Sequence, residues 1–160
     1  MVKPKRKNHL GEFPLRRKLV STLLLMALFA GGIAVIYPYE TWLIGAYLAL
    51  WIVSYPVIFA GTCRYCANYG KPCPVVLEGG MVHRFFNRAD KPFGMMQLAW
   101  ASAAYMLRIA VPWVIIVQYQ LWPWGIIYGM IFVSYWFFHL RITGCPNCVN
   151  YDCVLNPGRE

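Results

Sequence analysis

Four apolar runs, each long enough to cross a bilayer, dominate the 160-residue sequence. A membrane-spanning helix needs about 17–25 consecutive apolar residues. The runs cover residues 19–36, 42–61, 95–119 and 124–140. The connections 37–41 and 120–123 are too short to hold a domain, so each flanking pair is expected to form a tight antiparallel hairpin. The sequence therefore predicts an all-α integral membrane protein with four transmembrane helices in two tandem hairpins, 19–61 and 95–140.

Composition excludes most soluble classes. The chain is 59% hydrophobic and 13% charged, whereas soluble domains are about 45–50% apolar and about 25% charged. The six Asp and Glu residues all lie outside the apolar runs, which argues against a proton or cation transporter. Nucleotide-binding, zinc-protease and serine-hydrolase motifs are absent from the sequence. We therefore expect a membrane protein that is not an enzyme on its own and that has no nucleic-acid partner.

The basic residues predict the topology. Of the 15 Lys and Arg residues, seven lie in an N-terminal arm (1–18), five in the middle loop (62–94) and two in the tail (141–160). The two short connections contain none. Because cytoplasmic segments carry the excess of Lys and Arg, the arm, loop and tail are all predicted to be cytosolic, in the cell membrane. The arm is expected to orient the chain and to contact anionic lipid. A cleaved signal peptide is the alternative interpretation of the first run.

Arg108 is the only charged residue inside an apolar run. An Arg at the centre of a membrane helix costs about 2.5–3.5 kcal/mol, so it should face protein or water rather than lipid. It is expected either to pair with a carbonyl group, a Tyr or a partner subunit, or to contact a quinone or a lipid head group. Pro112 and Pro56 each remove a backbone donor and predict bends in the third and second spans.

The cysteines carry the most specific motif. The first hook (63–73) contains Cys63, Cys66 and Cys73, and the second hook (145–153) contains Cys145, Cys148 and Cys153. Both hooks read C-x-x-C-[Ala/Val]-Asn-Tyr, and their first two cysteines are offset by the same 82 positions (63 to 145 and 66 to 148). Each hook closely follows the second span of a hairpin. The sequence thus predicts a tandem repeat of hairpin and hook, with every cysteine on the cytosolic side.

The hooks suit a metal, because a C-x-x-C turn directs both thiolates into one tetrahedron and a reducing cytosol disfavours disulfides. Zinc is the first expectation and an iron–sulfur cluster the second. The C-x2-C-x6-C spacing of the first hook resembles a half-site of the binuclear Zn2Cys6 modules of fungal transcription factors, a likeness limited to these residues. Such a module would bind two zinc ions through six thiolates. Alternatively each hook forms its own site, with His83 or His139 as a fourth ligand. Thiol–disulfide redox chemistry and purely structural cysteines also remain open.

The middle loop also contains a short amphipathic segment, residues 81–88, in which apolar and basic side chains alternate at helical spacing. It predicts a helix lying in the membrane interface. Together these features predict a metal-binding anchor, accessory or electron-relay subunit of a larger membrane complex. The alternative is a membrane thiol–disulfide oxidoreductase that exchanges electrons with a quinone, which would require the cysteines on the oxidising side.

Overall fold

The computed structural model describes residues 14–66, 69–71, 73, 76–91 and 94–143. Its long helices are α1 (Leu15–Ile36), α2 (Thr41–Gly61), α4 (Met95–Gln118) and α5 (Trp122–Phe138). Short helices follow α2 and α5, and α3 (Val76–Phe85) lies in the middle loop. All regular structure in the described ranges is helical. Four helical segments are long and apolar enough to cross a membrane, which agrees with the predicted all-helical chain with four candidate spans.

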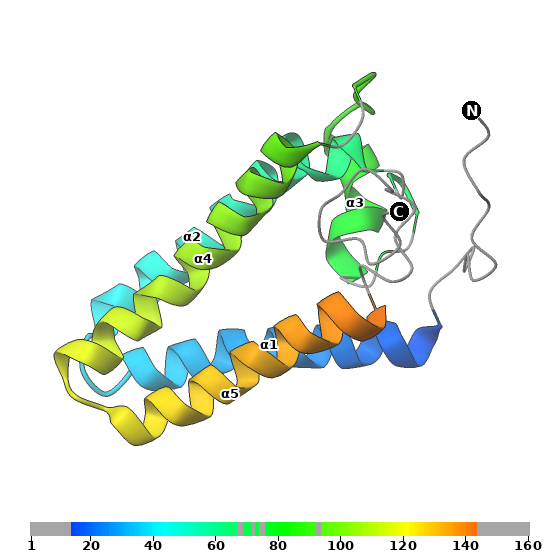
Figure 1. Ribbon diagram of the computed structural model, residues 1–160. Coiled ribbons are helices and arrows are strands. Elements are labelled where there is room, and N and C mark those ends of the chain that lie inside the picture. The colour runs from blue at the N-terminus through cyan, green and yellow to red at the C-terminus, as the bar shows by residue number, and fades with distance from the viewer. Residues whose placement is uncertain (1–13, 67–68, 72, 74–75, 92–93, 144–160) are drawn as a thin grey trace.

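The helix pairing differs from the expected hairpins. The most extensive packing joins α1 with α5 and α2 with α4, and α1 also packs against α4. Helices joined by the short connections contact each other less. In Figure 1 the α1/α5 pair and the α2/α4 pair form the two arms of a V, which meet at the short connections and diverge toward α3. The hairpin arrangement is therefore not confirmed. A short connection brings only the ends of two helices together, and side-chain packing decides which helices pair along their length.

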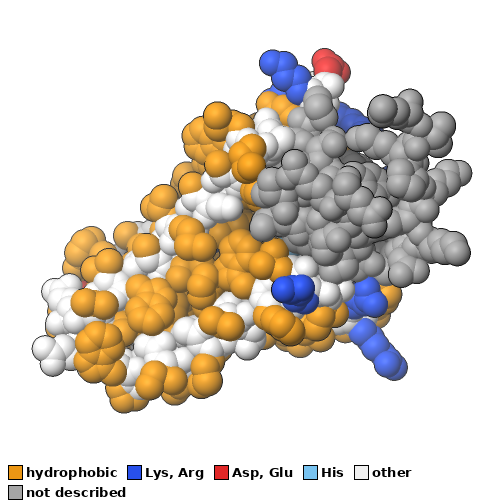
Figure 2. Space-filling model, viewed as in Figure 1, with side chains coloured by type: hydrophobic (Ala, Val, Ile, Leu, Met, Phe, Trp, Pro, Cys, Tyr) orange, Lys and Arg blue, Asp and Glu red, His pale blue; other side chains and the backbone are white. Residues whose placement is uncertain are grey.

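Most of the surface of the two arms is apolar. In the most apolar window of each span, only 17% to 33% of the residues are buried. Figure 2 shows hydrophobic side chains over the visible face of both arms, with Lys and Arg side chains gathered at the open end of the V. Exposed apolar surface on this scale is stable next to hydrocarbon, not next to water. The fold is thus consistent with contact with a lipid bilayer.

The core lies where all four long helices meet. Its fully buried members include Leu28 and Ile36 of α1, Tyr47 of α2, Ile116 of α4 and Tyr128 of α5. The ring of Tyr47 stacks on Phe29 with centroids 6.0 Å apart. Pro56 and Pro112 lie inside α2 and α4, and both helices continue past them. The bends that these prolines predict remain untested.

A polar contact ties the two short connections together. The Glu40 carboxylate accepts a hydrogen bond from Trp42 Nε1 at 2.9 Å and another from the Tyr119 hydroxyl at 3.0 Å. The rings of Tyr39 and Tyr119 lie 4.5 Å apart between centroids. Since Glu40 precedes α2 and Tyr119 follows α4, this contact holds together the ends of two helices that are distant in sequence.

Tyr119 should make the stability of this end depend on alkaline pH. Its hydrogen bond to Glu40, then burial and the carboxylate charge, raise the pKa of Tyr119 above its ordinary value. A raised folded-state pKa means that the stabilisation is complete below about pH 10 and is lost as the pH rises through the folded-state value. We expect wild type to melt at a slightly higher temperature than Tyr119→Phe at about pH 8, with the difference vanishing once the pH exceeds the raised pKa of Tyr119. Melting of both proteins across this range tests it, and a difference that persists at high pH would contradict it.

The open end is fastened within each arm. In one arm, Ser21 Oγ lies 3.3 Å from Thr143 Oγ1, and Arg17 Nη1 donates to the Ile142 carbonyl oxygen at 3.4 Å. In the other arm, Thr62 Oγ1 donates to the Gln97 carbonyl oxygen at 2.9 Å. These contacts join the start of α1 to the π-helical segment η2 (His139–Thr143), and the end of α2 to the start of α4. In each arm the two helices are therefore joined at the open end by hydrogen bonds.

Candidate functional site

The first hook starts immediately after α2. Thr62 ends that helix, and Cys63 begins the 3-10 helix η1 (Cys63–Tyr65). The Cys66 amide donates to the Cys63 carbonyl oxygen at 3.1 Å, and the Tyr69 amide donates to the Cys66 carbonyl oxygen at 3.1 Å. Two successive turns thus shape the C-x-x-C segment as the spacing predicts. Cys63, Cys66 and Cys73 are all half-buried.

Helix α3 covers the first hook. It begins five residues before the predicted segment 81–88 and ends at Phe85. It packs against η1 and α2, and Val82 is completely buried. The Tyr69 hydroxyl donates to the Phe86 carbonyl oxygen at 2.7 Å, which joins the end of α3 to the hook. The loop contains a helix whose ends differ from the predicted segment, and its position at the membrane interface remains a prediction.

No metal site is complete within the described residues. No group of three or more His, Cys, Asp or Glu side chains is placed there to hold an ion. Among the described residues, Cys63, Cys66 and Cys73 are not grouped as an ion site, either by themselves or with His83. Cys145, Cys148 and Cys153 lie outside the described residues. His139 lies at the start of η2 and stacks on Tyr135, with ring centroids 5.9 Å apart.

Arg108 is the most unusual side chain in the spans. It is 1% exposed and lies at the interface between α4 and α2. Its Nε donates to Ser54 Oγ at 2.6 Å, and Ser54 Oγ in turn donates to the Trp51 carbonyl oxygen at 2.8 Å. The guanidinium carbon lies 4.5 Å from the ring centroid of Trp51, 4.4 Å from that of Tyr55 and 5.1 Å from that of Tyr105. We call these four partners and Arg108 the Arg108 cage.

The cage provides hydrogen-bond acceptors for only part of the guanidinium group. Aromatic faces stabilise a desolvated cation by about 2 kcal/mol or more. Arginine carries five N–H donors, but Nη1 and Nη2 are buried and have no hydrogen-bond partner in the described structure. A buried donor without an acceptor costs about 1–3 kcal/mol. Arg108 faces protein, as expected. Of the expected partners two Tyr rings are present, whereas the hydrogen-bond acceptor is a serine and the third ring is a tryptophan.

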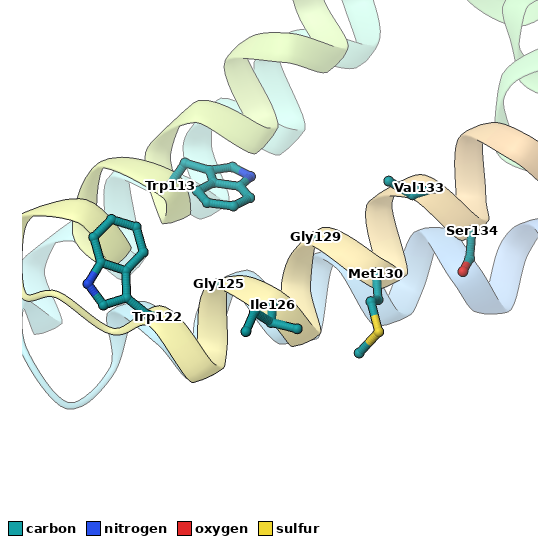
Figure 3. A pocket seen from close by; sticks show the side chains of 8 residues that line it. All are labelled: Trp113, Trp122, Gly125, Ile126, Gly129, Met130, Val133 and Ser134. Atoms are coloured by element: carbon teal, nitrogen blue, oxygen red, sulfur yellow. The ribbon is translucent and has the colours of Figure 1, made fainter.

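An apolar groove of about 670 Å³ lies beside α5, where Trp113 of α4 faces that helix (Figure 3). Its lining comprises Trp113, Trp122, Gly125, Ile126, Gly129, Met130, Val133 and Ser134. A Cβ atom at Gly125 would lie 3.0 Å from Ile116 Cγ2, and one at Gly129 would lie 3.5 Å from Trp113 Cζ2. The two glycines therefore allow α4 to approach α5. The groove has no charged side chain in its lining and suits hydrocarbon rather than a polar ligand.

The sequence alone missed the partners of Arg108. Trp51, Ser54 and Tyr55 have the spacing i, i+3 and i+4, which places them on one face of a helix. Ser54 is a polar residue in an otherwise apolar run. A polar residue flanked by aromatic residues on one helical face was the available signal, but only the pairing of α2 with α4 identifies Arg108 as its partner.

Comparison of the chain with protein-family models, with curated proteins and with solved structures gives no match. Its function therefore has to be argued from the residues and geometry described above.

Proposed function

We propose that this chain is a multi-pass membrane protein whose two cysteine hooks close one metal centre at the open end of the V. Zinc is the preferred metal and an iron–sulfur cluster the second candidate. The protein would serve as an anchor, accessory or electron-relay subunit of a larger membrane complex, at the cytosolic face of the cell membrane. Its basic arm would contact anionic lipid there.

The observation that carries this proposal is where the helices that precede the hooks end. The first hook follows α2, and the second hook begins two residues after η2 ends at Thr143. These helices belong to different arms, and both arms end at the open side of the V (Figure 1). A centre that takes thiolates from both hooks would connect the arms where they diverge.

Ligand counting supports a shared centre. A tetrahedral zinc ion or a common iron–sulfur cluster takes four ligands. The first hook has three cysteines, and no His, Asp, Glu or further Cys side chain among the described residues completes a metal site with them. The second hook has the same C-x-x-C-[Ala/Val]-Asn-Tyr motif and would provide the remaining thiolates.

Metal analysis of anaerobically purified protein tests the proposal. We expect about one or two zinc ions per chain, or the absorption of an iron–sulfur cluster. Cys66→Ser and Cys148→Ser should each release most of the metal, because each breaks the same centre. Arg64→Gln, which lies inside the same C-x-x-C turn and removes no thiol, should retain it.

Two outcomes would contradict this assignment. Protein that contains neither zinc nor iron, and whose melting temperature does not change with chelator, would exclude a structural metal centre. If each cysteine variant lost only half of the metal, the hooks would form separate sites.

Thiol labelling in intact cells tests the predicted side of the membrane. A membrane-impermeant reagent should leave Cys63 unmodified until the cells are opened, because the positive-inside rule puts the hook in the cytosol. Rapid labelling from outside would instead favour the thiol–disulfide oxidoreductase, whose cysteines face the oxidising side.

A further inference from the structure

A second candidate site lies between the candidate spans α2 and α4. The Arg108 guanidinium is 1% exposed, and among the described residues only its Nε has a hydrogen-bond acceptor, Ser54 Oγ at 2.6 Å. The N–H groups of Nη1 and Nη2 have no partner within the described part of the chain. The four N–H groups of this buried cation require an acceptor, such as an oxygen atom. No Asp or Glu occurs in the sequence of any of the four spans to meet it.

The surroundings restrict which acceptor fits. Trp51, Tyr55 and Tyr105 place their rings 4.4 Å to 5.1 Å from the guanidinium carbon. The face of an aromatic ring carries partial negative charge, so it repels an anion and favours stacking with an electron-poor ring. A ligand that reaches this depth must also dissolve in hydrocarbon. These three conditions describe a planar, apolar, electron-poor molecule with a carbonyl oxygen.

We propose that the Arg108 cage binds the head group of a membrane-dissolved quinone, with a quinone carbonyl oxygen accepting hydrogen bonds from Nη1 and Nη2 of Arg108. The quinone ring would stack against the aromatic side chains of the cage, and its hydrocarbon tail would remain in lipid. Tyr55 and Tyr105 are only half-buried, unlike the guanidinium that they enclose. The ring would therefore enter between α2 and α4 beside these two side chains.

Binding of decylubiquinone to the full-length protein in phosphatidylcholine nanodiscs tests this site. Quinones quench tryptophan fluorescence, and Trp51 lies in the cage, so quenching should saturate. Arg108→Met removes every donor but keeps an apolar side chain of similar length, and we expect its Kd to rise at least about tenfold. Arg141→Met removes an arginine outside the cage, and its Kd should stay within about twofold of wild type.

A second variant covers the case in which Arg108→Met does not fold. Tyr105→Leu leaves the cation and removes one ring, and it should weaken binding about threefold to tenfold through lost stacking. Quenching of wild type that never saturates, or an Arg108→Met protein that folds and binds as tightly as wild type, would overturn the proposal.

Lipid provides the remaining outcome. If nanodiscs containing phosphatidylglycerol abolish decylubiquinone binding in wild type, and Arg108→Met no longer retains this lipid, the acceptor is a lipid phosphate and the quinone assignment is wrong.

The quinone site is proposed independently of the cysteine hooks. Cys66→Ser should bind decylubiquinone like wild type even if it has lost its metal, so failure of one proposal is distinguishable from failure of the other.

Discussion

Replacing Gly32 by alanine is expected to destabilise the helix bundle by about 1–3 kcal/mol, the usual cost of overpacking a filled core. A Cβ atom at this position would collide with the Tyr47 hydroxyl group, and it would lie 2.7 Å from Tyr47 Cζ and 3.0 Å from Pro112 Cγ. Tyr47 is 1% exposed and stacks on Phe29, so its ring has no free space to enter. The three helices α1, α2 and α4 would have to separate at their common contact. Thermal unfolding in detergent measures the loss.

Gly45→Ala is the matched control. Gly45 also lies within a long helix, α2, but a Cβ atom there meets nothing within 4 Å. Alanine has a higher helix propensity than glycine by about 0.8–1.0 kcal/mol, so this variant should be as stable as wild type or slightly more stable. Equal destabilisation by both substitutions would show that the close approach of Tyr47 to Gly32 is not what limits the packing.

Val82→Asp is expected to detach α3 from α2 and to expose the first hook. Val82 is completely buried, and α3 packs against both α2 and η1. Burying an unpaired carboxylate costs several kcal/mol, which exceeds what one short helix gains from packing. Helix α3 should therefore detach from α2 and η1. Cys63 and Cys66, now half-buried, should then react with a thiol reagent in metal-free protein at least about tenfold faster. The rate of modification, followed by absorbance, gives the result directly.

His83→Asp introduces the same charge one residue further on, at an exposed position of α3. It should leave the thiol reaction rates within about twofold of wild type, because no burial is lost. Equal acceleration by Val82→Asp and His83→Asp would mean that charge, rather than packing of α3, controls access to the hook.

The four candidate spans were predictable because a helix that crosses a bilayer must have a minimum length and an apolar composition. Both properties can be read directly from a segment of sequence. The structure moves their ends by a few residues, most at α1, which starts at Leu15 and therefore includes Arg16, Arg17 and Lys18. Long basic side chains extend from a helix end into the polar interface, so the helix continues beyond the apolar run.

Helix pairing was not predictable in the same way. Short connections at 37–41 and 120–123 favoured two hairpins, yet α1 packs most with α5 and α2 with α4. The helices are apolar on nearly every face, so no amphipathic stripe in the sequence marks which face contacts which neighbour. Local fit decides instead, as at Gly32, which accommodates the Tyr47 side chain.

The sequence by itself determined that the chain has four helices long and apolar enough to cross a membrane, that Arg108 needs a protein environment, and that two cysteine motifs repeat. Hydrophobicity, charge and residue spacing are local properties, and so these conclusions needed no contacts. Only the tertiary structure decided that Ser54, Trp51 and Tyr55 of α2 surround Arg108, and that two of its nitrogens have no acceptor in the described part of the chain. These residues are about fifty positions from Arg108 in sequence, and packing between helices, which no local pattern encodes, brings them together.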